Sequence, residues 1–353
     1  MKISQLRKQI DLLDQKILER LNQRARLSHR VGEIKLKEGK SIYVPDREWE
    51  VYQQLLRFNK GPLNESAIRA IYREIMSGSL ALEKPLRVAY LGPSASFTHQ
   101  AALEKFGSSV THEGMNSIPS VFFEVGKERC DYGVVPIENS TEGVVNHTLD
   151  MFIHSDLKIC SEILLEISHC LMALSSIKQI RKVYSNPQAL AQCRVWLLKH
   201  LSGVELVEVS STTKAAQLAR KNSKSAAIAS RLAASEYHLK ILAEGIEDSS
   251  ENLTRFLVIG KTIANPTQQD KTSLMFSLKD RVGALHAVLK IFKDHGINLT
   301  KIESRPSKRR AWEYYFFVDL QGHCENQKVR SALEKIEKKC SFLKILGSYP
   351  MAY

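Results

Sequence analysis

The sequence contains no long hydrophobic run. Its most apolar stretch, residues 163–174, is interrupted by Glu166, Ser168 and His169, whereas a membrane-spanning helix needs about 18 apolar residues in succession. The first residues are charged throughout and lack the apolar core and the small-residue cleavage site of a signal peptide. We therefore expect a soluble chain with a cytoplasmic location and no membrane partner.

Cysteine, glycine and proline are also sparse. The six cysteines contain no C-x-x-C pair, which favours reduced, buried thiols over a disulfide framework or a zinc site. The 17 glycines and 10 prolines are too few for a collagen-like or low-complexity chain. We expect folded domains without a zinc site.

Positive charge is in excess, with 51 Lys and Arg against 38 Asp and Glu, a formal charge of +13. Such an excess suits nucleic acid, an acidic membrane surface or small anions. The charge is segregated, because residues 1–84 carry +6, residues 85–270 carry −1 and residues 271–353 carry +8. The hydrophobic patterning changes at the same places, which indicates three domains at 1–84, 85–262 and 271–353.

The first region is predicted to be all helical. Apolar residues recur at alternating spacings of three and four, which is typical of an amphipathic helix: Ile3, Leu6, Ile10, Leu13 and Ile17. That helix, running to about residue 37, would be roughly 50 Å long, and two shorter helices follow, after Pro45 and over residues 66–83. Three helices cannot wrap so long a rod into a compact monomer, so we expect an intertwined helical dimer.

The other two regions contain strands. Residues 85–262 alternate short β-branched runs with helical segments, which predicts an α/β domain with a mainly parallel sheet. A polar linker over residues 261–270 follows. The last region has the βαββαβ order of an α+β ferredoxin-like module.

Two cations of the first region can share one face of the long helix. Arg24 and Lys35 lie 11 residues apart, so they differ by about 20° around the axis and by roughly 16 Å along it, and both can reach one small anion. Arg7 lies about 25 Å from Arg24 and could join them only from a partner subunit. The alternative is that these are solvated surface cations.

Together with residues further along, these cations resemble the active-site pattern of the all-helical chorismate mutases. The resemblance implies that Arg24 and the partner's copy of Arg7 bind the substrate carboxylates, since guanidinium pairs with carboxylate in bidentate fashion. Lys35 would bond the ether oxygen that breaks away. The remaining implied substrate contacts are Val44 through its N–H, Arg47, Glu48, Ser79 and Glu83.

Some relatives have Gln where this chain has Glu83, and only a protonated Glu can donate a hydrogen bond to the ether oxygen. We expect a raised pKa for Glu83 and mutase activity that declines as the pH rises. The rearrangement of chorismate to prephenate is pericyclic and needs no nucleophile, so catalysis would come from holding the reactive conformer and stabilising charge.

Hydroxyl-rich and amide-rich turns punctuate the middle region. The strings VPIENSTEG, at residues 135–143, and NLTRF, at residues 252–256, make the region resemble prephenate dehydratase, which implies two α/β lobes of periplasmic-binding-like fold. The resemblance implies Thr254 as the essential hydroxyl, which assists departure of hydroxide. Other implied contacts are Asn139, Ser140, Thr141, Ser211, Arg255 and Phe256. For Ser211 alone, an ordinary helix N-cap is the simpler interpretation.

Two segments of the last region resemble the ACT domain, a regulatory fold that in dehydratases binds phenylalanine at a subunit interface. They are Gly283, Ala284, Leu285 and His286 at a helix start, and Glu303, Ser304, Arg305 and Pro306 at a strand end. The resemblance implies feedback inhibition by phenylalanine. The basic run 308–310 is interpreted as a solvated hairpin.

The whole pattern predicts a bifunctional enzyme that converts chorismate to prephenate and prephenate to phenylpyruvate, as a homodimer or larger homo-oligomer. We expect it to need no metal and no organic cofactor. One alternative is a non-catalytic amino-acid sensor built on the same folds. A second alternative, an RNA-binding protein, lacks an RNP-type aromatic motif to accompany the charge, so we expect no nucleic-acid partner.

Overall fold

The computed structural model describes residues 2–249, 251–307 and 314–352, and the chain divides into two compact units. Unit 1 comprises residues 1–87 and 103–111, and unit 2 comprises residues 88–102 and 112–353. The basic run 308–310, expected to be a hairpin, lies outside the described residues.

Unit 1 is helical, as predicted. Its elements are α1 (Ile3–Lys37), α2 (Pro45–Phe58), α3 (Glu65–Glu83) and the end of α4 (Phe97–Phe106). Gly32 is the buried residue of α1, and a Cβ there would lie 2.8 Å from Cβ of Glu83. The glycine therefore allows α1 to pack closely against the end of α3.

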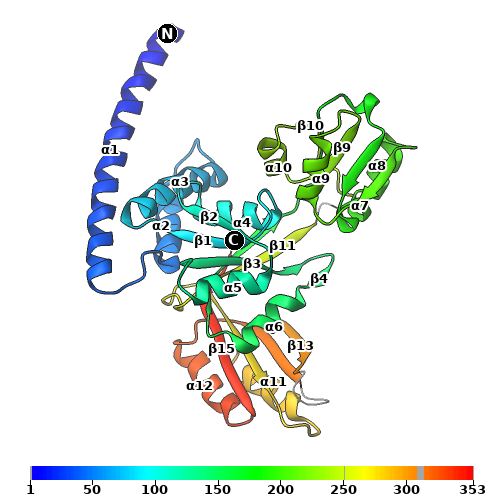
Figure 1. Cartoon of the computed structure of the whole chain (residues 1–353). Helices are drawn as coiled ribbons and strands as arrows, with labels where there is room; N and C mark the ends of the chain where they lie inside the picture. The colour runs from blue at the N-terminus through cyan, green and yellow to red at the C-terminus, as the bar shows by residue number, and fades with distance from the viewer. Residues whose placement is uncertain (1, 250, 308–313, 353) are drawn as a thin grey trace. The chain divides into compact units, whose positions relative to one another are not determined.

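Most of the apolar stripe of α1 is exposed to solvent in the part of the chain that the structure describes. Ile3, Ile10 and Ile17 are 71%, 54% and 55% exposed, and the N-terminal half of the helix runs well beyond α2 and α3 (Figure 1). A stripe of this length exposed to water is unfavourable. The stripe has the position that the predicted intertwined dimer requires.

The first lobe of unit 2 is a six-stranded sheet in the order β2-β1-β3-β11-β5, with β4 paired to β3 (Figure 1). Apolar side chains of its helices and strands form one core, which includes Val121, Phe122 and Phe152. The elements are β1 (Arg87–Leu91), β2 (Thr111–Met115), α5 (Ile118–Gly126), β3 (Tyr132–Asn139), β4 (Gly143–Val144), α6 (Asn146–His154), β5 (Lys158–Glu166) and β11 (Leu253–Gly260).

The second lobe is a five-stranded sheet in the order β10-β6-β9-β7-β8. Small residues dominate its strand β9, which is buried throughout. The elements are β6 (Cys170–Ala173), a 3₁₀ turn (Ile177–Gln179), β7 (Lys182–Ser185), α7 (Pro187–Gln192), α8 (Arg194–His200), β8 (Glu205–Glu208), α9 (Thr212–Ala219), β9 (Ser225–Ala229), α10 (Arg231–Glu236) and β10 (Lys240–Glu244).

The expectation of a mainly parallel sheet is wrong, because both sheets are mixed. Pairs β1–β3, β7–β8 and β7–β9 are parallel. Strand β11 runs antiparallel to both β3 and β5, and β6 runs antiparallel to β9 and β10. The difference arises because β11 returns from the second lobe into the middle of the first sheet, a long-range pairing that the local βαβα rhythm does not reveal.

The C-terminal part of unit 2 has the predicted βαββαβ order. Its four-stranded antiparallel sheet has the order β13-β14-β12-β15. One face packs on the two helices around Phe276 and Phe292. The elements are β12 (Asp270–Ser277), α11 (Ala284–Asp294), β13 (Leu299–Pro306), β14 (Tyr314–Gln321), α12 (Gln327–Glu337) and β15 (Phe342–Pro350).

No helix among the described residues is both long enough and apolar enough to span a bilayer. Within the same residues, no cluster of three or more His, Cys, Asp or Glu side chains could hold a metal ion.

Candidate active sites

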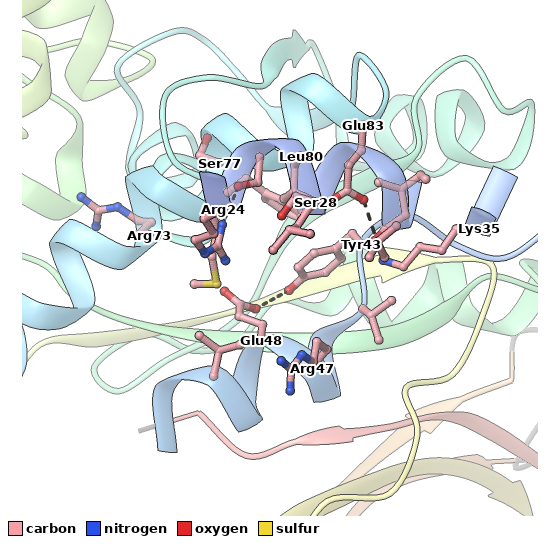
Figure 2. Close-up of a pocket in the computed structure, with 18 of the residues that line it drawn as sticks. Arg24, Ser28, Lys35, Tyr43, Arg47, Glu48, Arg73, Ser77, Leu80 and Glu83 are labelled. Carbon is pink, nitrogen blue, oxygen red and sulfur yellow. Dashed lines mark hydrogen bonds and ion pairs between the residues drawn. The ribbon is translucent and has the colours of Figure 1, made fainter. Parts of the chain in front are cut away.

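Unit 1 contains a cavity of about 330 Å³, within the usual size range of small-molecule sites. Its walls come from α1, α2, α3 and the end of α4. Figure 2 shows charged side chains from three of these helices directed toward the same space. Seven of the eight residues expected to contact the mutase substrate line it: Arg24, Lys35, Val44, Arg47, Glu48, Ser79 and Glu83.

Two cations of α1 are held in place by neighbouring groups. Arg24 donates from Nη1 to the Ser79 hydroxyl at 2.6 Å, and that hydroxyl donates to the Ile75 carbonyl at 2.9 Å. Lys35 donates from Nζ to the Ile42 carbonyl at 2.7 Å. The spacing of 11 residues therefore does bring both cations to one cavity, while each keeps hydrogen-bonding capacity for a ligand.

Glu83 lies at the end of α3, where its side chain is only 8% exposed. Its Oε2 is 3.9 Å from Nζ of Lys35 and has no hydrogen-bond partner among the described residues. Burial raises the pKa of Glu83, although Lys35, Arg24 and His29 act in the opposite direction. The structure agrees with the raised pKa expected from the sequence.

Glu48 is held by two groups that the sequence analysis missed. Its Oε2 accepts from the Tyr43 hydroxyl at 2.8 Å (Figure 2) and from Nζ of Lys105 at 2.7 Å. Lys105 and Phe106 belong to the end of α4, and the Phe106 ring lies 5.0 Å from that of Tyr43. No pattern within residues 1–84 could have indicated Lys105 and Phe106, because both lie outside that region, at the end of α4.

Two predicted mutase residues stand apart from this cluster. Arg47 lines the cavity, but its Nη1 pairs with Glu50 at 2.9 Å and its side chain is 60% exposed. Arg7 is exposed on α1, and it is not among the cavity-lining residues of its own chain. Its separation of 17 residues from Arg24 corresponds to about 25 Å of helix.

In unit 2, Asn139 and Thr254 face each other across β3 and β11. The Asn139 amide donates to the Thr254 hydroxyl oxygen at 2.7 Å and to Oδ1 of Asn252 at 2.8 Å. Oδ1 of Asn139 accepts from the Thr141 hydroxyl at 2.6 Å. The two specific sequence strings therefore meet at one point of the first sheet.

Ser140 fixes the backbone of this junction. Its N–H donates to the Leu253 carbonyl at 2.9 Å, its hydroxyl donates to the Glu251 carbonyl at 2.8 Å, and its oxygen accepts from the Leu253 N–H at 3.0 Å. Ser140 holds the strand ends together rather than presenting a free hydroxyl.

The structure does not bring three other predicted residues to this junction. The Arg255 guanidinium is buried against Glu162 and Asp319, at 2.7 and 2.5 Å. Phe256 is a core residue, 2% exposed. Ser211 lies in the second lobe as the N-cap of α9, where its oxygen accepts from the Lys214 N–H at 3.0 Å. The capping interpretation of Ser211 is confirmed.

Gln192 contacts the junction and His169 contacts Gln192; neither residue was predicted. Gln192, at the end of α7, donates to the Thr141 hydroxyl oxygen at 3.4 Å and accepts from the Asn252 amide at 3.1 Å. Nε2 of His169 lies 2.9 Å from the same Gln192 oxygen, and Nδ1 is buried without a partner. Burial lowers the pKa of His169, which favours the neutral ring. No sequence motif marks either residue.

The predicted effector residues lie at two points of the C-terminal module. Gly283 has a left-handed φ of +78° and precedes α11, whose first turn contains Ala284, Leu285 and His286. Glu303, Ser304, Arg305 and Pro306 end β13. Nη2 of Arg305 pairs with Asp150 of α6 at 3.1 Å. Ser304 is exposed.

Three family profiles match the sequence: chorismate mutase type II over residues 6–84, prephenate dehydratase over 88–264 and the ACT domain over 272–338. The chain is 54% identical to the bifunctional chorismate mutase/prephenate dehydratase of Aquifex aeolicus, over 99% of this chain and 98% of the relative. It is 47% identical to the protein of the same name from Pseudomonas aeruginosa, over 98% and 97%.

A solved structure resembles most of unit 2. The prephenate dehydratase of Arthrobacter aurescens in complex with L-Phe superposes with a TM-score of 0.70 at 32% identity, covering 75% of this chain and 90% of that chain. The first two profiles correspond to the two activities in the names of the full-length relatives, and the third is the ACT domain. The chain therefore belongs to the family of bifunctional chorismate mutase/prephenate dehydratases that carry a C-terminal ACT domain.

Proposed function

We propose that the cavity of unit 1 rearranges chorismate to prephenate, and that the Asn139–Thr254 junction of unit 2 converts prephenate to phenylpyruvate. The observation that carries the mutase proposal is the convergence of seven of the eight expected residues on one cavity. Two cations and a buried carboxyl group converge there from α1 and α3, which suits a small dicarboxylate with a breaking ether bond.

At the mutase site, Arg24 binds one substrate carboxylate, and Arg7 of a second copy of the chain binds the other. Lys35 and protonated Glu83 donate to the ether oxygen, on which negative charge grows as the C–O bond breaks. Oε2 of Glu48 is occupied by Tyr43 and Lys105. Its other oxygen is thereby oriented to accept from the ring hydroxyl of the substrate.

At the dehydratase site, prephenate loses CO₂, the electron pair of the broken C–C bond enters the ring, and the ring hydroxyl departs. The departing hydroxide takes a proton from the Thr254 hydroxyl to become water, and solvent water returns a proton to Thr254. The Asn139 amide can only donate, so Thr254 accepts from it and keeps its own hydrogen for the leaving hydroxyl. The side-chain hydrogens of Asn139 and Thr141 are committed to neighbouring groups, so these residues hold Thr254 in place. Because both are neutral, they add no charge that would over-stabilise the carboxylate that leaves as CO₂. Ring aromatisation drives the step.

The working unit that we propose is a homodimer in which the two α1 helices cover each other's apolar stripes. The exposed Ile10 and Ile17 support this arrangement, and a partner helix would also bring Arg7 to the cavity. We place the enzyme in the cytoplasm, in keeping with six cysteines that form no disulfide in the part of the chain that the structure describes.

Phenylalanine is the effector that we propose for the ACT domain. The L-Phe complex of the Arthrobacter aurescens dehydratase supports it, as does the left-handed Gly283 at the start of α11, which leaves backbone open to a carboxylate.

Incubating the purified chain with chorismate, with and without phenylalanine, tests this function. We expect prephenate to form first, phenylpyruvate to follow, and phenylalanine to suppress the second step. Phenylalanine binding without turnover of either substrate would instead identify a non-catalytic sensor.

A further inference from the structure

The pair Asn139–Thr254 has a second pair directly beside it on the same strands. Thr254 is in register with Asn139, and Arg255 is in register with Glu138. Successive side chains of a strand point to opposite faces of the sheet. The candidate dehydratase residues therefore lie on one face, and Glu138 and Arg255 lie on the other.

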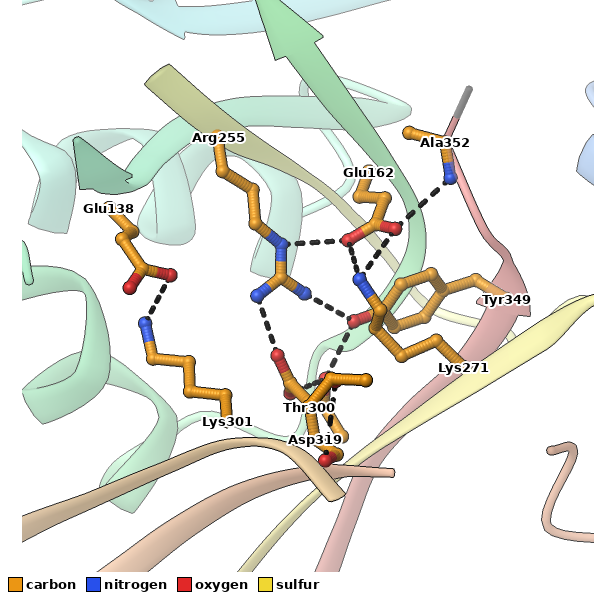
Figure 3. A network of polar contacts seen from close by, with 10 residues as sticks. Glu138, Glu162, Arg255, Lys271, Thr300, Lys301, Asp319, Tyr349 and Ala352 are labelled. Atoms are coloured by element: carbon orange, nitrogen blue, oxygen red, sulfur yellow. Dashed lines mark hydrogen bonds and ion pairs between the residues drawn. The ribbon is translucent and has the colours of Figure 1, made fainter. Parts of the chain in front are cut away.

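The ACT domain supplies the partners of that second face. Lys301 of β13 donates from Nζ to Oε2 of Glu138 at 2.7 Å, and its side chain is only 12% exposed. Figure 3 shows this ion pair beside the larger cluster around Arg255. The residue next to Asn139 in the chain is thus tied to the ACT domain.

Arg255 is surrounded by acceptors from both domains. Nε pairs with Glu162 of β5 at 2.7 Å, Nη1 pairs with Asp319 of β14 at 2.5 Å, and Nη2 donates to the Tyr349 hydroxyl of β15 at 3.0 Å (Figure 3). Lys271 of β12 also donates to Glu162, at 2.8 Å. Two cations face two carboxylates, so the buried cluster is balanced in charge.

The strands beneath these ion pairs are closely packed. Met275, Phe317 and Tyr349 of the ACT sheet share one hydrophobic core with Phe152 and Ile159 of the first lobe. At Gly347 of β15, a Cβ would lie 2.0 Å from the Ile159 carbonyl oxygen. The ACT sheet therefore lies directly on the back of the sheet that carries Thr254.

We propose that Lys301 and Asp319 of the ACT domain are positioning residues for the dehydratase, holding Asn139 and Thr254 in place through Glu138 and Arg255 from the opposite face of the sheet. This inference rests on the proposed dehydratase site. The ACT domain then supports dehydration itself, in addition to any effector that it binds. Displacing a reacting group by about 1 Å can cost a hundredfold in rate. Small shifts of these strands would therefore be enough to slow dehydration.

The test compares Lys301→Met, Lys301→Arg and Asp319→Asn with the unmodified chain. The matched control is Lys344→Met, because Lys344 is an ACT lysine that donates to the Phe152 and Ser155 carbonyls, away from Asn139 and Thr254. Dehydratase kcat and KM are measured with prephenate. Mutase kcat, measured on the same preparations, reports on the fold of unit 1, and a thermal unfolding curve of each variant reports on the fold of unit 2.

We expect Lys301→Met and Asp319→Asn to lower dehydratase kcat about tenfold or more, with a smaller change in KM and unchanged mutase kcat. Lys301→Arg should keep most of the activity, and Lys344→Met should resemble the unmodified chain. Wild-type dehydratase kcat in Lys301→Met, or an equal loss in Lys344→Met, would overturn the inference, as would a parallel loss of mutase kcat. An unmodified chain that converts no prephenate would refute the proposed function instead.

Discussion

Oε2 of Glu83 lies 3.9 Å from Nζ of Lys35, too far for a hydrogen bond, and no other described group donates to it. The carboxyl group is nevertheless buried beside a cation. Desolvation outweighs the attraction to Lys35, so the pKa of Glu83 is raised. The site therefore favours a neutral Glu83 that can donate to the substrate.

The first prediction concerns pH. A raised pKa extends the protonated, donating form to higher pH, and that form is lost as the pH rises through the pKa. Mutase kcat/KM should therefore fall on the alkaline side, whereas Glu83→Gln, which donates at every pH, should lack this limb. The measurement is a pH profile of both proteins with chorismate. Superimposable profiles would remove Glu83 from the proposed role.

A second prediction concerns the dimer. Arg7→Ala and Arg24→Ala should each abolish most mutase activity. If each site takes one arginine from each chain, a mixed dimer retains one intact site, so an equal mixture refolded together should recover roughly a quarter of wild-type activity. No recovery in the mixture would show that both arginines act within one chain.

A third prediction concerns Lys105. Lys105→Met removes one of the two donors to Oε2 of Glu48, so mutase kcat/KM should fall about tenfold, the loss expected when a charged hydrogen-bond partner is removed. Lys199→Met, at an exposed position of α8, serves as the control and should have no effect. Unchanged kcat/KM in Lys105→Met would mean that Tyr43 alone orients Glu48.

The helices of unit 1 could be predicted almost to the residue. The long α1 ends at Lys37, as its apolar spacing indicated, and α3 ends at Glu83. Local periodicity suffices there because the helices need no distant partner to define them. Strand pairing is different, since the antiparallel β11 depends on contacts more than 100 residues apart.

Like the fold, the two sites were predictable from the sequence only in part. Motifs located Asn139 and Thr254, which a single hydrogen bond joins. They could not tell which of Thr254 and Arg255 faces the site. Alternation places these neighbours on opposite faces of the sheet, but only the register of β3 and β11 shows that Thr254 shares a face with Asn139. Lys105 and Gln192 escaped prediction because each contacts its site from an element outside the motifs.

A fourth prediction concerns feedback inhibition. Gly283 has φ of +78°, a conformation that costs an alanine of the order of 1 kcal/mol. Gly283→Ala should therefore weaken phenylalanine inhibition of the dehydratase severalfold while leaving kcat without phenylalanine unchanged. Gly296→Ala, with φ of +58° beyond the other end of α11, is the matched control. Equal inhibition of Gly283→Ala and the unmodified chain would place the effector elsewhere.

The central claim is that one chain carries two activities at separate sites. Incubating the Thr254→Ala variant with chorismate tests this claim most directly. Thr254 lies in unit 2 and the mutase cavity lies in unit 1, so only the second step should fail. We predict prephenate formation at the wild-type rate and a loss of phenylpyruvate formation of at least about a hundredfold, because the proton donor to the leaving hydroxide is removed. Phenylpyruvate formation at the wild-type rate, or loss of both products together, would contradict the account.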